Sequence, residues 1–261
     1  MTDRPWQPPP PPSPRNAGRD AMLTWFVVAA LVTVLVQINI KLPAVGHLGS
    51  ALVAVLFLYA PVLVAMWRKE DLESYGFHAE PIKRGLKIAG IAMLIAFPVF
   101  VVSYLGFYEI ACKSDLLAHL VPPGMCGRYG GLDQLHAPAV SVLRLDPDTT
   151  LSLEFGAIQL IVVALPEELF FRGFLLGLLE QRFPPKRRWL GGGIGLALLL
   201  TSIAFALIHL PKAGDPRNIA TFFPGLLFGW MRSATGSILA GTLTHAGSNI
   251  LVRTLELMVQ R

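Results

Sequence analysis

Three ionisable residues stand within an apolar stretch in the second half of the chain. The segment from Leu165 to Phe174 reads Leu-Pro-Glu-Glu-Leu-Phe-Phe-Arg-Gly-Phe and contains Glu167, Glu168 and Arg172. One charge at the centre of a bilayer costs about 2.5–3.5 kcal/mol on insertion scales, so three charges indicate partners and a function. Glu168 and Arg172 are four residues apart, share a helix face and are expected to pair. Glu167 points about 100° away and suits a general base or acid.

Further polar side chains occur in two other apolar stretches. Only two of the six histidines, His209 and His245, lie in such stretches, and Asn249 follows His245 by four residues on the same helix face. A single histidine of this kind is often only hydrogen-bonded to a neighbouring helix. Because polar groups inside apolar helices need partners, we expect these three side chains and Glu167 to converge in one cluster, which would be an active site.

The composition predicts a membrane protein. Of the 261 residues, 53% are hydrophobic and only 15% are charged, whereas a soluble domain has about 25% charged residues. The runs 21–40, 42–67 and 88–108 carry no charge and reach the length of about 20 residues that a bilayer core requires. The basic residues behind the net charge of +5 flank these runs. They indicate membrane topology and argue against nucleic-acid binding.

We therefore expect an all-α, multi-pass transmembrane bundle with about seven spans. The predicted spans are 21–40, 48–67, 86–107, 153–179, 189–210, 218–232 and 236–256. The sixth is short and could be tilted or interfacial, in which case the C-terminus changes sides.

These spans suggest four regions along the chain. Residues 1–20 are expected to be a disordered, proline-rich cytoplasmic tail, because the run from Pro8 to Pro12 cannot continue a helix. Residues 21–107 hold three transmembrane helices, 108–152 an extracytoplasmic loop, and 153–256 the catalytic helical core.

The side of each loop follows from its basic residues. With the N-terminus in the cytoplasm, 13 Lys and Arg residues lie inside and 8 outside, leaving out Arg172, so we predict N-inside and C-outside. The expected location is a cell membrane, the inner membrane of a bacterium.

Cys112 and Cys126 lie in the one long outer loop. We expect them to form a disulfide in an oxidising space, with two free thiols as the alternative.

Small residues and a proline bear on the packing of the predicted fourth and sixth spans. Gly173 and Gly177, and likewise Gly225 and Gly229, are four residues apart, a spacing that permits close helix approach in membranes. Pro166 precedes Glu167, and we hypothesise that it kinks the helix and admits water.

Three motifs together resemble the CPBP family, the Abi or CAAX-protease-like intramembrane endopeptidases. They are Glu-Glu-x-x-x-Arg, Phe-x-x-x-His and His-x-x-x-Asn, each on its own apolar span, and the resemblance covers about residues 150–255. The residues that carry it are Glu167, Glu168 and Arg172, then Phe205 and His209, then His245 and Asn249.

The resemblance implies peptide-bond hydrolysis near the C-terminus of a membrane-associated protein or peptide. By position, Glu167 and His209 would activate water, and His245 and Asn249 would stabilise the oxyanion. Glu168 and Arg172 would hold the fourth helix, with Phe205 lining the site. Prenyl-protein endopeptidases are the best-known members, and a myxosortase-like group is thought to remove C-terminal sorting tags.

Two mechanistic questions remain open at this level. Glu167, His209 and His245 could instead bind zinc, since three protein ligands and a water are a usual catalytic pattern. We expect no metal cofactor, because His-Glu-x-x-His is absent and the family resemblance favours glutamate-type members. A non-catalytic protein of the same fold, such as an immunity factor, scaffold or chaperone for a secreted peptide, is the alternative function. A third possible function is that of a proton-coupled transporter. The sequence shows no internal repeat of the kind that many transporters have.

Overall fold

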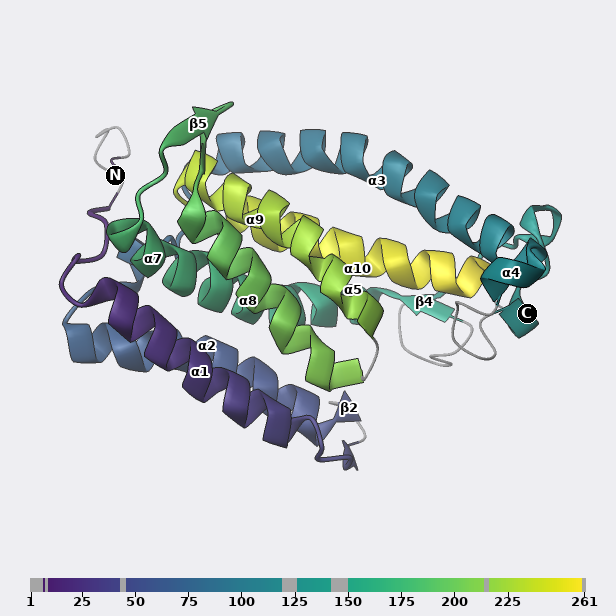
Figure 1. Cartoon of the computed structure of the whole chain (residues 1–261), viewed down its shortest axis with the longest axis horizontal. Coiled ribbons are helices and arrows are strands. Elements are labelled where there is room, and N and C mark those ends of the chain that lie inside the picture. The colour runs from purple at the N-terminus through teal and green to yellow at the C-terminus, as the bar shows by residue number, and fades with distance from the viewer. Residues whose placement is uncertain are drawn as a thin grey trace. The chain divides into compact units, whose positions relative to one another are not determined.

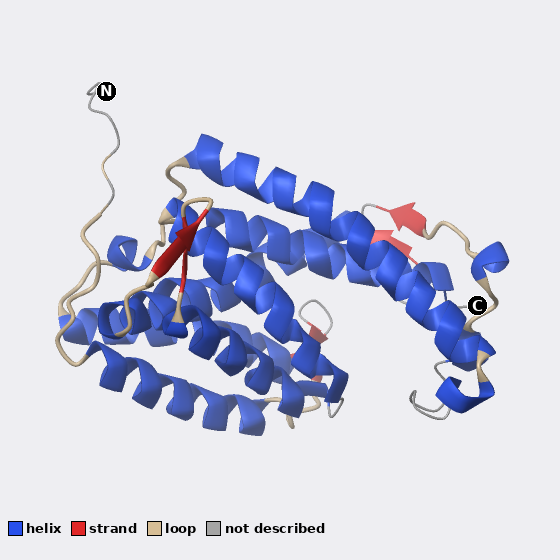
Figure 2. Ribbon diagram, turned by 45° about the horizontal axis from the view of Figure 1, so that its top comes forward, coloured by secondary structure: helices blue, strands red, loops and turns tan. Residues whose placement is uncertain are grey.

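The computed structural model describes residues 7, 9–42, 46–118, 126–141, 150–213 and 216–259, and it is mostly helical (Figures 1 and 2). Among these described residues, three helices are long and apolar enough to cross a membrane: α1 (Ala17–Leu35), α2 (Leu48–Arg68) and α3 (Ile82–Lys113). They correspond to the first three predicted spans. The chain is therefore an integral membrane protein by the character of its helices, whereas seven crossings are not confirmed.

The predicted fourth span is one continuous helix that changes its hydrogen-bond register. It runs through α5 (Leu153–Ile158), η4 (Gln159–Ala164), α6 (Leu165–Glu168), η5 (Leu169–Leu175) and α7 (Leu176–Arg182). The segments η4 and η5 are π-helical, so the four residues of α6 lie between two wider turns. Pro166 contributes to this irregularity because it removes one N–H donor from the helix.

The predicted start of the fifth span is wrong. Strands β5 (Arg187–Trp189) and β6 (Gly192–Ile194) form an antiparallel hairpin there, and helix α8 (Leu196–Ala213) begins only afterwards. The hairpin turns at Leu190 and Gly191, which both have positive φ. Glycine-rich sequence at this point therefore marks a turn.

Two helices complete the C-terminal part. The 3-10 helix η6 (Pro216–Thr221) leads into α9 (Phe222–Thr235), and α10 (Leu239–Val259) follows after a turn. The remaining strands are two short pairs: β1 (Lys41–Leu42) with β2 (Gly46–His47), antiparallel, and β3 (Ala139–Ser141) with β4 (Thr150–Ser152), parallel.

Two compact units cut across the predicted division of the chain. The first contains Met1–Ala89 and Leu160–His245, and the second Gly90–Gln159 and Ala246–Arg261. In the first unit, the aromatic ring of Phe57 on α2 packs against Phe170 and Phe171 of the fourth helix. Helices α1 and α2 are therefore part of the core that holds the candidate site.

The tail before α1 is more ordered than predicted. Helix α1 begins at Ala17, and Arg68 at the end of α2 donates to the backbone oxygens of Ser13 and Arg15. Arg68 also pairs with Asp20 and Glu70, so one buried guanidinium ties the tail to two helices. Residues 1–6 and 8 of the predicted tail lie outside the described residues.

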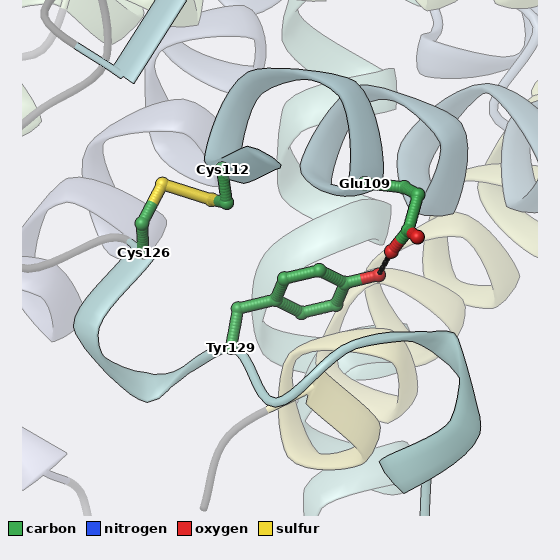
Figure 3. Close-up of a disulfide and its surroundings, with 4 residues drawn as sticks. All are labelled: Glu109, Cys112, Cys126 and Tyr129. Carbon is green, nitrogen blue, oxygen red and sulfur yellow. Dashed lines mark hydrogen bonds between the residues drawn. A yellow bond between two sulfur atoms is a disulfide. The ribbon is translucent and has the colours of Figure 1, made fainter. Parts of the chain in front are cut away.

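In the second unit, a disulfide joins Cys112 at the end of α3 to Cys126 in the 3-10 helix η2 (Cys126–Arg128) (Figure 3). Beside it the Tyr129 hydroxyl donates to Glu109 Oε2 at 2.6 Å. Burial and this bond raise the pKa of Tyr129 to about 12. The short helices α4 (Asp115–Ala118) and η3 (Leu132–Gln134) belong to the same region. Residues 119–125 and 142–149 of the predicted loop lie outside the described residues.

Candidate active site

Glu168 is the centre of a buried ion-pair network in the first unit. Its side chain is fully buried, and Arg172 Nη1 donates to its Oε1 at 2.8 Å. The ring of His245 on α10 approaches the same oxygen, with Nδ1 at 3.0 Å. The pair expected from the spacing of Glu168 and Arg172 is present, and a histidine 77 residues away joins it.

Glu167 faces two imidazoles. Its Oε2 lies 3.7 Å from His209 Nε2 and 3.8 Å from His245 Nε2. The Glu167 and His245 residues are each only 6% exposed. Both separations exceed a direct hydrogen bond. A single water can lie about 2.8 Å from two atoms that are 3.7 Å apart, so the spacing suits a bridging water.

The other ring nitrogen of each histidine is already engaged. His209 Nδ1 is 2.6 Å from the backbone oxygen of Phe205, which can only accept. His245 Nδ1 faces the Glu168 carboxylate. These contacts assign a proton to Nδ1 in both rings, and Nε2 of each ring faces Glu167.

Aromatic rings surround the charged groups. The Arg172 guanidinium lies 3.9 Å from the centre of the Phe205 ring and 5.2 Å from that of Phe228. The His245 ring stacks on Phe228, with centroids 5.1 Å apart. Phe205, predicted to line the site, thus covers the cation. These contacts keep bulk water away from the ion pair, which strengthens its electrostatics.

Glycines permit the close approach of the helices that carry the site. A Cβ atom on Gly241 of α10 would lie 2.7 Å from Glu168 Oε2, and one on Gly225 of α9 would lie 3.5 Å from Arg172 Nη2. The predicted pair of Gly225 and Gly229 therefore lies at an interhelical contact, since Gly229 packs on the side chain of Leu198. Gly241 belongs to no motif noted in the sequence.

The π-helical turns on both sides of Glu167 and Glu168 belong to the site. Such turns are rare and often occur at functional positions. Here they set the direction in which α6 presents its two adjacent carboxylates, one to Arg172 and one to the histidines.

Asn249 lies in the second compact unit. Its Nδ2 donates to Oε1 of Gln159 in η4 at 2.8 Å. Gln159 was not among the predicted site residues, because nothing in its sequence context relates it to a residue 90 positions away. The contact fixes the orientation of the Asn249 amide, whose second N–H can still donate to another group.

The donor set of Glu167, His209 and His245 is chemically suited to zinc. The separations of 3.7 and 3.8 Å from Glu167 to the two imidazoles are within a few tenths of an ångström of the roughly 3.3–3.6 Å between two ligands of one tetrahedral zinc. Among the described residues, no group of three His, Cys, Asp or Glu is arranged to hold a metal ion.

Comparison with known proteins gives one match. Residues 149–251 match the family described as type II CAAX prenyl endopeptidase Rce1-like. Searches of curated proteins and of solved structures found no match. The matched segment contains all three motifs and every residue of the cluster around Glu167 and Glu168. Residues 149–251 are therefore similar to the CAAX-protease-like (CPBP) family.

Proposed function

We propose that the chain is an intramembrane endopeptidase that cleaves a membrane-associated protein or peptide near its C-terminus. The observation that carries the proposal is the convergence of two imidazole Nε2 atoms on one oxygen of the buried Glu167. A buried carboxylate, two imidazoles and apolar walls in one place suit the hydrolysis of an amide. The family match supports the reaction class.

Water activation is assigned to Glu167 and His209. A water held between Glu167 Oε2 and His209 Nε2 loses a proton to the carboxylate while its oxygen attacks the substrate carbonyl carbon. When the tetrahedral intermediate collapses, the C–N bond breaks and the proton passes from Glu167 to the leaving amine. Proton transfer by a positioned group contributes about 10²–10⁴-fold to such reactions.

Oxyanion stabilisation is assigned to His245 and Asn249. His245 donates from Nε2 to the oxyanion when both ring nitrogens carry protons, while Nδ1 of the same ring donates to the Glu168 carboxylate. The amide of Asn249 does not titrate and donates at any pH. Glu168 thus acts as a positioning residue for His245, with Arg172 fixing Glu168 in turn.

The proposal is tested by comparing the C-termini of membrane-associated proteins in three strains: wild type, knockout, and knockout with Glu167→Gln. We expect C-terminally shortened products only in the wild type. Identical C-termini in all three strains would favour a non-catalytic scaffold or immunity factor. Shortened C-termini in the strain that carries Glu167→Gln would contradict the assignment of Glu167 as the general base.

A zinc-dependent mechanism has its own test. We propose a glutamate-type site without a metal cofactor, because the zinc-binding motif His-Glu-x-x-His is absent from the sequence. Metal analysis of the purified protein and activity after chelation distinguish the two. If activity is lost on chelation and restored by zinc, the glutamate mechanism is wrong and a zinc mechanism takes its place.

A further inference from the structure

A crevice in the first unit lies away from the residues of the candidate active site. Its volume is about 490 Å³, and it lies between the start of α1, the end of α7 and Leu200 of α8. Its apolar lining includes Ala17, Met22, Leu179 and Phe183. Neither the family match nor the proposed reaction assigns it a role.

Two guanidinium groups, those of Arg19 and Arg182, border this apolar crevice. The aliphatic part of Arg182 packs across Gly18, where a Cβ atom would lie only 3.1 Å from Arg182 Cγ. Its guanidinium lies 5.0 Å from the ring centre of Phe183. The side chain of Arg182 is therefore held beside the start of α1.

Arg19 remains open to a ligand although it touches an acid. Its side chain is 58% exposed and contacts Asp20 Oδ1 at 3.2 Å. The other oxygen of Asp20 is bound by the buried Arg68 at 2.5 Å. Because most of the Arg19 side chain is exposed and its guanidinium has five N–H donors, it can contact a second anion besides Asp20.

The crevice lies at the end of a candidate membrane span. Helix α1 begins at Ala17 and carries no charged residue after Asp20. Leu23, Phe26 and Val27 are exposed along it, as expected for a surface in contact with acyl chains. The residues that begin a span lie at the level of the lipid headgroups.

We propose that this crevice binds an anionic phospholipid. The headgroup phosphate contacts Arg19 and Arg182, and an acyl chain lies against Met22 and Leu200. Arginine forms strong, forked hydrogen bonds with phosphate, and basic pockets between membrane helices are suited to anionic headgroups. Phosphatidylcholine also has a phosphate, but its choline cation would lie near the same two arginines and be repelled by them.

The test uses the full chain in phosphatidylcholine nanodiscs that contain phosphatidylglycerol, with retained lipid measured by native mass spectrometry. We expect wild type to retain phosphatidylglycerol, and R19Q/R182Q to bind it about 10- to 30-fold more weakly, since two interfacial cations are lost. The matched control is R187Q/R188Q, which removes two exposed hairpin arginines outside the crevice and should bind as wild type does.

Two more variants keep the test decisive if R19Q/R182Q fails to fold. R19K/R182K retains the charge and should retain the lipid, and M22E places a negative charge at the partly exposed Met22 and should release it. Equal retention by wild type and M22E would overturn the proposal. The proposal would also be overturned if R187Q/R188Q lost as much bound phosphatidylglycerol as R19Q/R182Q does, or if wild type showed no preference for phosphatidylglycerol over phosphatidylcholine.

Discussion

Glu168 receives contacts from two side chains that the sequence places far apart. Arg172 and His245 both bind its Oε1 inside the first unit. Its neighbour Glu167 instead faces the two Nε2 atoms. Adjacent carboxylates on one short helix thus have different partners, and we propose a positioning role for Glu168 and a catalytic role for Glu167.

Glu168→Gln should destabilise the fold, because it leaves the Arg172 charge buried without its partner. Breaking a buried pair by removing one partner costs about 3–5 kcal/mol. Thermal unfolding in detergent measures this against Glu167→Gln, which should unfold close to the wild-type temperature. Equal unfolding temperatures for the two variants would contradict the central position of Glu168.

Gly241→Ala should destabilise the first unit, since its Cβ would meet Glu168 Oε2 at 2.7 Å. Overpacking of this kind costs about 1–3 kcal/mol. Gly90→Ala on α3 is the matched control, because nothing lies within 4 Å of its Cβ position. The control should be neutral or slightly stabilising. Unfolding temperatures that rank the two variants in the opposite order would refute the close contact.

Residue types and spacing predicted the Glu168–Arg172 pair because both residues lie on one helix turn. They could not predict the bond from His245 to Glu168 or the bond from Asn249 to Gln159. Those partners are 77 and 90 positions apart. Their contact depends on how helices pack, which helical periodicity does not encode.

At the scale of elements, the fourth helix differs most from a regular α-helix. Apolar periodicity predicted its existence, and its length agrees closely with the prediction. The two π-helical segments around α6 were not predicted, apart from the irregularity expected at Pro166. The hairpin before α8 was also missed, because a glycine-rich apolar run resembles the start of a span.

Replacing both Cys112 and Cys126 by Ser should loosen the end of α3 without unfolding the first unit. The disulfide closes a loop with a sequence separation of 14, and a loop of that size contributes about 3 kcal/mol in the chain-entropy model. Hydrogen exchange should quicken around Glu109 and Tyr129 only. Faster exchange throughout α1 and α2 would show that the disulfide supports the whole chain.

At the scale of the whole molecule, the apolar runs predicted a helical membrane protein, but not the number of crossings. Helix α9 has 14 residues and spans about 21 Å, less than the roughly 30 Å of a bilayer core. Its hydropathy alone cannot decide whether it crosses. The two compact units likewise depend on contacts between distant segments.

The network around Arg68 makes the stability of the molecule depend on pH. Burial alone would raise the pKa of Glu70, but hydrogen bonds from Arg68 and Tyr75 outweigh it and lower the pKa below 4.5. The stabilisation is thus complete above about pH 4.5 and is lost as the pH falls through the folded-state pKa. Thermal unfolding of wild type and Glu70→Gln should differ at pH 7 and converge in acid. A difference that grows in acid would contradict this sign.

The most direct test of the proposed mechanism is the cleavage rate of purified Glu167→Gln on a substrate identified from the shortened C-termini. The substitution keeps the size of the side chain and removes the base. We predict a rate at least about 100-fold below wild type, with an unchanged unfolding temperature. Cleavage within a few-fold of the wild-type rate would contradict the assignment of Glu167 as the catalytic carboxylate.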